Sequence, residues 1–125
     1  MSTLVDTSVL IDFLRGRNEA ADTLRHARQD GPLHASEITR LELLAGMRAS
    51  EERPTESLLS TLVWHPVDEA VAKEAGALGR RWLPSHRGID SADLAIAATA
   101  TLIGARLLTC NVRHFPMFDG LAKPY

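Results

Sequence analysis

The sequence predicts an α/β fold in which a mostly parallel sheet of four to five strands is flanked by helices. Short apolar runs alternate along the chain with segments whose apolar residues recur at helical spacing, which is typical of repeated strand–helix units. Two of the strand-like runs are followed by polar residues, Asp6 and Asn111, as at the carboxyl ends of strands that form ligand sites. The length of 125 residues fits a single domain over residues 1–125.

The first half of the chain contains two strand–helix units, each followed by a further helix. An apolar run ending at Asp6 predicts the first strand, and Thr7 or Ser8 is a suitable N-cap for the helix that closes at Gly16. The remaining predicted elements are a helix from Asn18 to about Asp30, a strand from Leu33 to Ala35, a helix from Glu37 to about Ala49 capped by Ser36, and a helix starting at Pro54.

The second half continues the alternation. We expect a strand from Val63 to Val67, a helix capped by Asp68 that runs through Trp82, a buried helix from Ser91 to Ile103, a strand from Arg106 to Cys110, a loop from Asn111 to Phe118, and at most a short edge strand from Leu121 to Lys123. Pro84 and Gly104 are the expected stop signals for the two helices.

Composition restricts the class of protein. No apolar run approaches the ~20 residues of a membrane span, and the first apolar segment is too short for a signal peptide. The single cysteine, Cys110, excludes a disulfide within the chain and suits a reducing compartment. We therefore expect a cytoplasmic protein that does not enter a membrane, with Cys110 as a small buried residue. The net charge of -2 neither supports nor excludes a nucleic-acid partner.

Three carboxylates are candidates for a common site, and each has an ordinary structural alternative. Asp6 follows the first strand, where its alternative role is to cap the next helix. Glu42 lies between leucines on the helical face of Ile38 and Ala45, so its burial would require a metal or a salt bridge. The candidate salt-bridge partners are Arg40, Arg80 and Arg81.

The third carboxylate, Asp93, falls in the first turn of the apolar helix and should point into the protein. Its alternative is a capping box in which Asp90 or Ser91 is the cap. We interpret Asp90 mainly as a cap with an outer role in the site. Asn111 repeats the position of Asp6 at the end of a strand, although Asn is also a common turn residue.

These groups suit a hard divalent cation. Carboxylate and amide oxygens are the ligands that Mg²⁺ or Mn²⁺ prefers, and carboxylates that converge without a cation raise one another's pKa. Such a site can activate water and stabilise the leaving oxygen in phosphodiester hydrolysis, with one metal or two. No cysteine pair or histidine spacing indicates zinc, and neither a glycine-rich phosphate loop nor a nucleophile elbow is present. A small acidic-pocket phosphatase or a receiver-like signalling domain would need a lysine at a strand end and a phospho-acceptor pair, which the sequence lacks.

Four ordered segments resemble those of PIN-domain ribonucleases, and specifically of VapC toxins from type II toxin–antitoxin pairs. The segments are VDTSVLIDFL at 5–14, SEITRLELLAG at 36–46, DLAIAATA at 93–100 and TCNVRHF at 109–115. The resemblance implies a PIN-like, Rossmann-like sheet and Mg²⁺-dependent endoribonuclease activity, with Mn²⁺ as a possible substitute. Matched by motif, Asp6, Glu42 and Asp93 would be the catalytic and metal-binding residues, supported by Thr7 or Ser8.

The same resemblance implies partners: an RNA substrate, a second copy of the chain in a homodimer, and a VapB-type antitoxin that blocks the site. We expect a basic antitoxin side chain near the acidic core and an apolar groove between the early helices, with Leu10, Phe13, Leu14 and Leu44 as candidates for exposure. Many relatives have Asp where this chain has Asn111, so the number of metals stays open. The alternative hypothesis is a catalytically weak PIN-like module that binds RNA or protein.

Overall fold

The computed structural model describes residues 1–125 as a four-stranded sheet with six α-helices and two short 3₁₀ helices. In chain order the elements are β1 (Thr3–Val5), α1 (Thr7–Leu14), α2 (Asn18–Arg28), β2 (Leu33–Ser36), α3 (Glu37–Gly46), η1 (Ala49–Glu51), α4 (Glu52–Leu59), β3 (Val63–His65), α5 (Glu69–Trp82), α6 (Ser91–Ile103), β4 (Arg106–Leu108) and η2 (Val112–His114). None of the helices combines the length and the apolar character that crossing a membrane requires.

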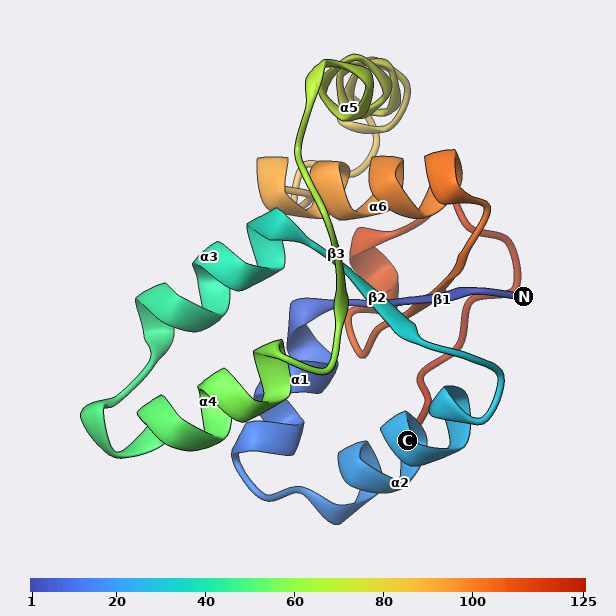
Figure 1. The fold of residues 1–125 in the computed structure, drawn as a ribbon. Coiled ribbons are helices and arrows are strands. Elements are labelled where there is room, and N and C mark those ends of the chain that lie inside the picture. Colours follow the sequence, from blue (N-terminus) through green and yellow to red (C-terminus); the bar gives the residue numbers. More distant parts are fainter.

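The sheet confirms the predicted architecture. Its order is β3-β2-β1-β4 and every pairing is parallel, which places β1 in the interior with Leu4 opposite His34 on one side and Leu107 on the other. The segment from Leu121 to Lys123 forms no strand, so the expected optional fifth strand is absent. Helices α5 and α6 lie on one side of the sheet, and α1, α2 and α4 lie on the other (Figure 1).

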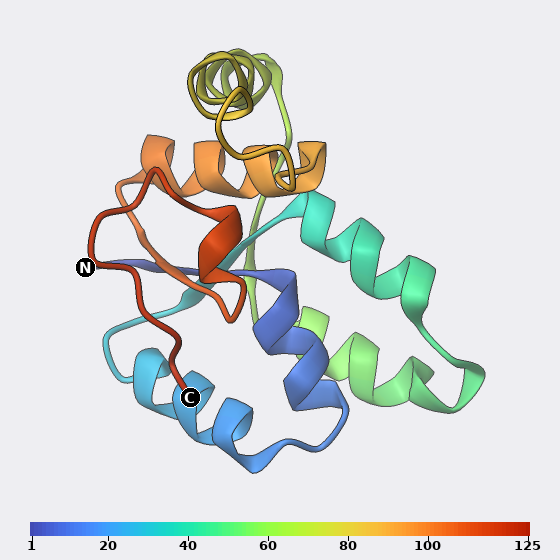
Figure 2. The same cartoon turned by 180° about the vertical axis from the view of Figure 1, so that it is seen from behind.

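Alternate residues of β1 enter two separate cores. Val5 packs with Leu33 of β2 and with apolar residues of α1, α2 and α4, whereas Leu4 packs with Ile96 of α6 and Leu107 of β4. Alternation is the expected behaviour of a strand that is covered on both faces. The C-terminal segment runs across the back of the molecule from η2 and ends near α2 (Figure 2).

Several boundaries follow the predicted local signals. The Ser36 side chain accepts a hydrogen bond from the N–H of Ile38, and the Asp68 side chain accepts one from the N–H of Val71. Helix α6 has the predicted bounds and ends at Gly104, whose φ of +67° suits the left-handed C-cap. These caps are local, so the sequence carries enough information to place them.

Other boundaries were predicted wrongly. Thr7 and Ser8 lie inside α1, and the N-cap position belongs to Asp6. Asn18 is the first residue of α2 rather than its cap, and α4 begins at Glu52, before Pro54. In each case the helix begins one or two residues earlier than the local signal predicts. Strand β4 is also shorter than expected because Thr109 and Cys110 leave the ladder for the site described below.

Candidate active site

A polar cleft of about 390 Å³ lies where β1 and β4 end and where α1 and α6 begin. It contains all seven residues that the sequence predicted for the site. The cleft is lined by Asp6, Thr7, Ser8, Ile11, Asp12, Glu42, Asp90, Asp93, Cys110, Asn111 and His114. These residues come from four separate parts of the chain, and the parallel sheet with its crossovers brings them to one edge.

Asp6 lies at the N-cap position of α1 but does not cap the helix with its side chain. Its side chain is buried, with 3% exposed, and it makes no capping hydrogen bond although the residue is at the N-cap position of α1. One carboxylate oxygen, Oδ2, instead accepts hydrogen bonds from Ser8 Oγ and Thr109 Oγ1, each at 2.7 Å. The alternative that Asp6 only caps the helix is therefore wrong, since two hydroxyls hold its carboxylate in the cleft.

Glu42 enters the cleft from α3 and is bound by a hydroxyl rather than by an arginine. Thr7 Oγ1 donates to Glu42 Oε1 at 2.7 Å, and the buried Thr39 hydroxyl lies 2.9 Å from the Thr7 oxygen. The salt-bridge alternative is wrong, because Arg40 pairs with Glu37 and none of the three arginines bonds Glu42.

Glu42 is also less buried than expected. Of the leucines around it in the motif, Leu43 is buried in the core, but Leu41 and Leu44 are 59% and 44% exposed, so the leucines do not enclose the carboxylate. Glu42 itself is only partly buried. The carboxylate is therefore accessible from the cleft.

Asp93 takes part in both of the arrangements that the sequence left open. Its N–H donates to Asp90 Oδ1 at 2.8 Å and its Oδ2 accepts the Asp90 N–H at 3.1 Å, which completes the capping box of α6. Asp93 is nevertheless only 8% exposed and lines the cleft, where His114 Nδ1 lies 3.1 Å from the same Oδ2. Capping and a place in the site are thus compatible.

Burial is the main cause of the altered acidity of this carboxyl group. It raises the pKa of Asp93 to about 6; the hydrogen bond from the Asp90 N–H opposes the increase, the Asp90 charge adds to it, and His114 opposes it. We expected mutual repulsion of the carboxylates to be the leading cause, but desolvation is larger. Asp93 therefore carries an energetic cost when ionised that a nearby cation would relieve.

Asn111 completes the cleft together with residues that we did not predict for the site. The Asn111 N–H donates to Thr109 Oγ1 at 2.9 Å, which fixes the backbone where the Asn111 side chain lines the cleft. His114 was missed because it is one of five scattered histidines; its place in the segment TCNVRHF at 109–115 is the signal that could have indicated it. Cys110 is half-buried in the wall instead of fully buried.

Asp12 lines the cleft, but its Oδ2 is already engaged. It accepts a hydrogen bond from Tyr125 Oη at 2.7 Å and lies 3.6 Å from Arg17 Nη1. Asp12 is therefore a structural carboxylate, in contrast to Asp6, Glu42 and Asp93, which have no arginine or lysine partner.

The oxygen ligands in the cleft are of the kind that a hard divalent cation prefers, but they are not arranged closely enough to enclose one. Carboxylates from β1, α3 and α6 and the amide of Asn111 supply oxygen ligands around one cleft. No three acidic, histidine or cysteine side chains are close enough together to enclose a metal ion directly. Each carboxylate is instead held by a hydroxyl or a backbone N–H, and Mg²⁺ in proteins usually keeps several waters between itself and part of its ligand set.

Comparison with known proteins identifies the family to which this fold belongs. The family model described as PIN domain matches residues 3–121. The chain belongs to the PIN-domain family.

Its relatives place it within the VapC group of that family. It is 50% identical over 123 residues to Ribonuclease VapC19 of Mycobacterium tuberculosis, covering 98% of each chain. It is 45% identical over 122 residues to Ribonuclease VapC10 of the same organism, covering 98% of this chain and 92% of the relative. A toxin–antitoxin complex from Klebsiella pneumoniae contains a similar structure, with a TM-score of 0.80, 31% identity and coverage of 99% and 98% of the two chains.

Proposed function

We propose that this chain is an endoribonuclease toxin of a type II toxin–antitoxin pair and that it hydrolyses RNA phosphodiester bonds at the acidic cleft with Mg²⁺ or Mn²⁺. The observation that carries the proposal is the convergence of Asp6, Glu42 and Asp93 in one cleft without an arginine or lysine side chain to neutralise them. The ribonuclease names of its two VapC relatives support the RNA substrate.

The side chains of the cleft have separable tasks. Asp6, Glu42 and Asp93 would hold the metal, which when bound supplies a Lewis acid and lowers the pKa of water. Ser8 and Thr109 orient the Asp6 carboxylate by donating to one oxygen, Oδ2. The other oxygen, Oδ1, does not take part in these two bonds. Thr7 orients the Glu42 carboxylate in the same way. Fixed donors of this kind reduce the reorganisation that the carboxylates undergo when a cation and a phosphodiester enter.

Metal dependence is the first test of this function. We expect the purified chain to cleave total RNA in Mg²⁺ or Mn²⁺ and to lose cleavage in EDTA, with recovery when excess Mg²⁺ is restored. Ca²⁺ should support little cleavage because its coordination is looser. Cleavage that persists in EDTA would contradict the metal site. A folded chain that binds RNA but never cleaves it would favour the catalytically weak binding module.

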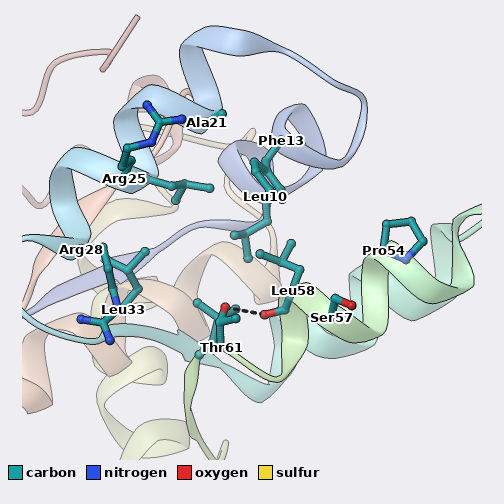
Figure 3. A pocket seen from close by; sticks show the side chains of 12 residues that line it. Leu10, Phe13, Ala21, Arg25, Arg28, Leu33, Pro54, Ser57, Leu58 and Thr61 are labelled. Carbon is teal, nitrogen blue, oxygen red and sulfur yellow. Dashed lines mark hydrogen bonds between the residues drawn. The ribbon is translucent and has the colours of Figure 1, made fainter.

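The antitoxin partner is proposed at a second surface, an apolar groove of about 570 Å³ between α1, α2 and α4 (Figure 3). Leu10 and Phe13 line it as expected, but Leu10 is fully buried at the base while Phe13 is 37% exposed. The other two candidates do not line this groove: Leu14 is partly buried against the core that contains Val5, and Leu44 is exposed on α3. The apolar lining, with Arg25 and Arg28 among its residues, suits an amphipathic antitoxin segment that carries acidic side chains.

Helix α1 separates the groove from the acidic cleft. Ile11 and Asp12 line the cleft, and Leu10 and Phe13 line the groove. One antitoxin could therefore dock an apolar segment in the groove and reach around α1 to place an arginine or lysine near Asp6. The similarity to the chain in the Klebsiella toxin–antitoxin complex supports a partner of this class.

The partner is tested by co-expression with the reading frame upstream of this one. We expect a complex that cleaves RNA far more slowly than the free chain. Phe13→Asp should weaken the complex, and Leu102→Asp, at an exposed leucine outside the groove, should not. A complex that cleaves as fast as the free chain would contradict the toxin–antitoxin function and leave the nuclease intact. The expected homodimer stays a prediction, which light scattering of the purified chain would check.

A further inference from the structure

A second cleft, of about 340 Å³, adjoins the acidic one. It is lined by Cys110, Asn111, Val112, Arg113, His114 and Lys123. Three of these residues, Cys110, Asn111 and His114, also line the acidic cleft. The two clefts therefore share a wall formed by the segment that follows β4, and a single extended ligand can occupy both.

The two clefts have opposite charge. Five carboxylates line the first, whereas the second has no acidic residue and contains Arg113 and Lys123. Both of these cations are exposed, and neither takes part in a salt bridge. Uncompensated arginine and lysine side chains in a concave site attract anions, and arginine is well suited to phosphate.

The walls that carry the two cations are fixed by packing. Arg113 lies in η2, directly before His114 and the fully buried Phe115, which is 1% exposed. Lys123 lies between Leu121, which packs on the core beneath α6, and Tyr125, which packs on the opposite core. The Tyr125 hydroxyl donates to Asp12 at 2.7 Å and Arg17 stacks on its ring at 4.7 Å, so the segment bearing Lys123 is held against the body of the protein.

We propose that this basic cleft is a substrate subsite that binds an RNA backbone phosphate adjacent to the phosphodiester that is cleaved. The inference rests on the proposed ribonuclease function and adds the residues that position the strand. In the acidic cleft the bound cation would offset the repulsion between a phosphodiester and the carboxylates, but the neighbouring phosphate would meet five carboxylates without a counter-charge. Arg113 and Lys123 offset that repulsion. They also fix the direction in which the RNA strand runs past His114 from one cleft to the other.

The test compares two double variants that remove the same charges. Arg113→Gln with Lys123→Gln removes both cations of the subsite, and Arg53→Gln with Lys73→Gln removes one arginine and one lysine that line neither cleft. Cleavage of a single-stranded RNA is measured in Mg²⁺ over a series of salt concentrations. Binding of the same RNA is measured separately with every chain carrying Asp6→Asn, so that no cleavage occurs.

We expect the subsite variant to raise KM and the dissociation constant about tenfold, with kcat within a few-fold of the parent. The slope of log affinity against log salt should fall by about 0.7 for each phosphate that the variant no longer binds. The control variant should leave KM, the dissociation constant and the salt slope unchanged. Unchanged KM, affinity and salt slope in the subsite variant would overturn the proposal. So would a variant that binds RNA normally but loses its antitoxin, since the cleft would then serve an acidic protein segment. A parent chain that binds RNA through these cations yet never cleaves it would contradict the ribonuclease function alone.

Discussion

Each of the three carboxylates in the acidic cleft is held by a hydroxyl or a backbone N–H. Asp6 is held by Ser8 and Thr109, Glu42 by Thr7, and Asp93 by the N–H of Asp90. These donors stabilise negative charge without neutralising it, which keeps the carboxylates oriented but apart. That separation explains why the side chains do not form a closed metal cage on their own.

Mutation should distinguish the role of Asp93 from that of Asp90, although the two residues are partners in one capping box. Asp93→Ala should abolish Mg²⁺-dependent cleavage, since it removes a carboxylate from the cleft. Asp90→Ala should retain cleavage and cost about 1 kcal/mol of stability because the helix is no longer capped. Cleavage assays with thermal melts check both, and Asp90→Asn, which keeps a cap, is the control. An inactive Asp90→Ala chain beside an active Asp93→Ala chain would assign the catalytic role to Asp90 instead.

The raised pKa of Asp93 predicts a pH dependence of stability in metal-free buffer. The folded state favours the protonated form, so the stabilisation is complete below about pH 4 and is lost as the pH rises through about 6. Asp93→Asn should be free of this loss. In EDTA, its stability relative to the parent should therefore increase by on the order of 2 kcal/mol between pH 4 and pH 7. If the stability of the two chains changed with pH in parallel, Asp93 would not be the source of this pH dependence.

At this scale the sequence predicted the acidic residues better than their partners. Asp6, Glu42 and Asp93 follow from motif and position, because a carboxylate between apolar neighbours is conspicuous. His114 and Asp12 could not be predicted, since their roles depend on contacts with Asp93 and Tyr125 that lie 21 and 113 residues away in sequence. The hydroxyl of Thr109 is a similar case, because its bond to Asp6 joins residues 103 apart.

Among the elements, helix α6 illustrates what local signals can specify. Its cap, apolar length and terminal glycine are all written in consecutive residues, and its bounds were predicted correctly. Strand β4 illustrates the limit, because Thr109 and Cys110 have strand-like neighbours but bond to Asp6 and Ser8 instead of extending the ladder. A strand end that contributes to a site cannot be located without the other strands.

The edge of the sheet carries a pH-sensitive contact between β2 and β3. His34 Nδ1 lies 2.8 Å from His65 Nε2, and burial, followed by the charge of His65, lowers the pKa of His34. The folded state therefore disfavours protonation of His34. Its stabilising contribution is present above about pH 6.5 and is lost as the pH falls through the lowered folded pKa.

We expect His34→Gln, which can still hydrogen-bond His65, to reduce the loss of melting temperature between pH 7 and pH 5. Thermal melts of the parent and the variant across that range check this prediction. His26→Gln, at an exposed histidine on α2, is the matched control and should follow the parent. If the melting temperature of His34→Gln fell as steeply as that of the parent between pH 7 and pH 5, the histidine pair would not be the source of the loss.

In the molecule as a whole, the parallel sheet gathers acidic groups from distant segments to one edge, and folding thus works against their repulsion. A divalent cation that binds only the folded chain should raise its stability, by about 2.7 kcal/mol at 100 times the dissociation constant. Melting curves in a series of Mg²⁺ and Mn²⁺ concentrations check this, with Glu42→Gln expected to show a smaller increase. A melting temperature that does not respond to millimolar Mg²⁺ or Mn²⁺ would favour a non-catalytic binding module.

The most direct measurement is the rate of RNA cleavage in Mg²⁺ by the parent chain and by Asp6→Asn, with a thermal melt of each. The amide keeps the size of the side chain and an oxygen for the Ser8 and Thr109 hydroxyls, so the fold should persist with unchanged or higher stability. Cleavage should fall at least about 100-fold, since the variant removes a charged ligand from the cleft. An Asp6→Asn chain that is folded and cleaves RNA within a few-fold of the parent would contradict the assignment of this acidic cleft as the ribonuclease site.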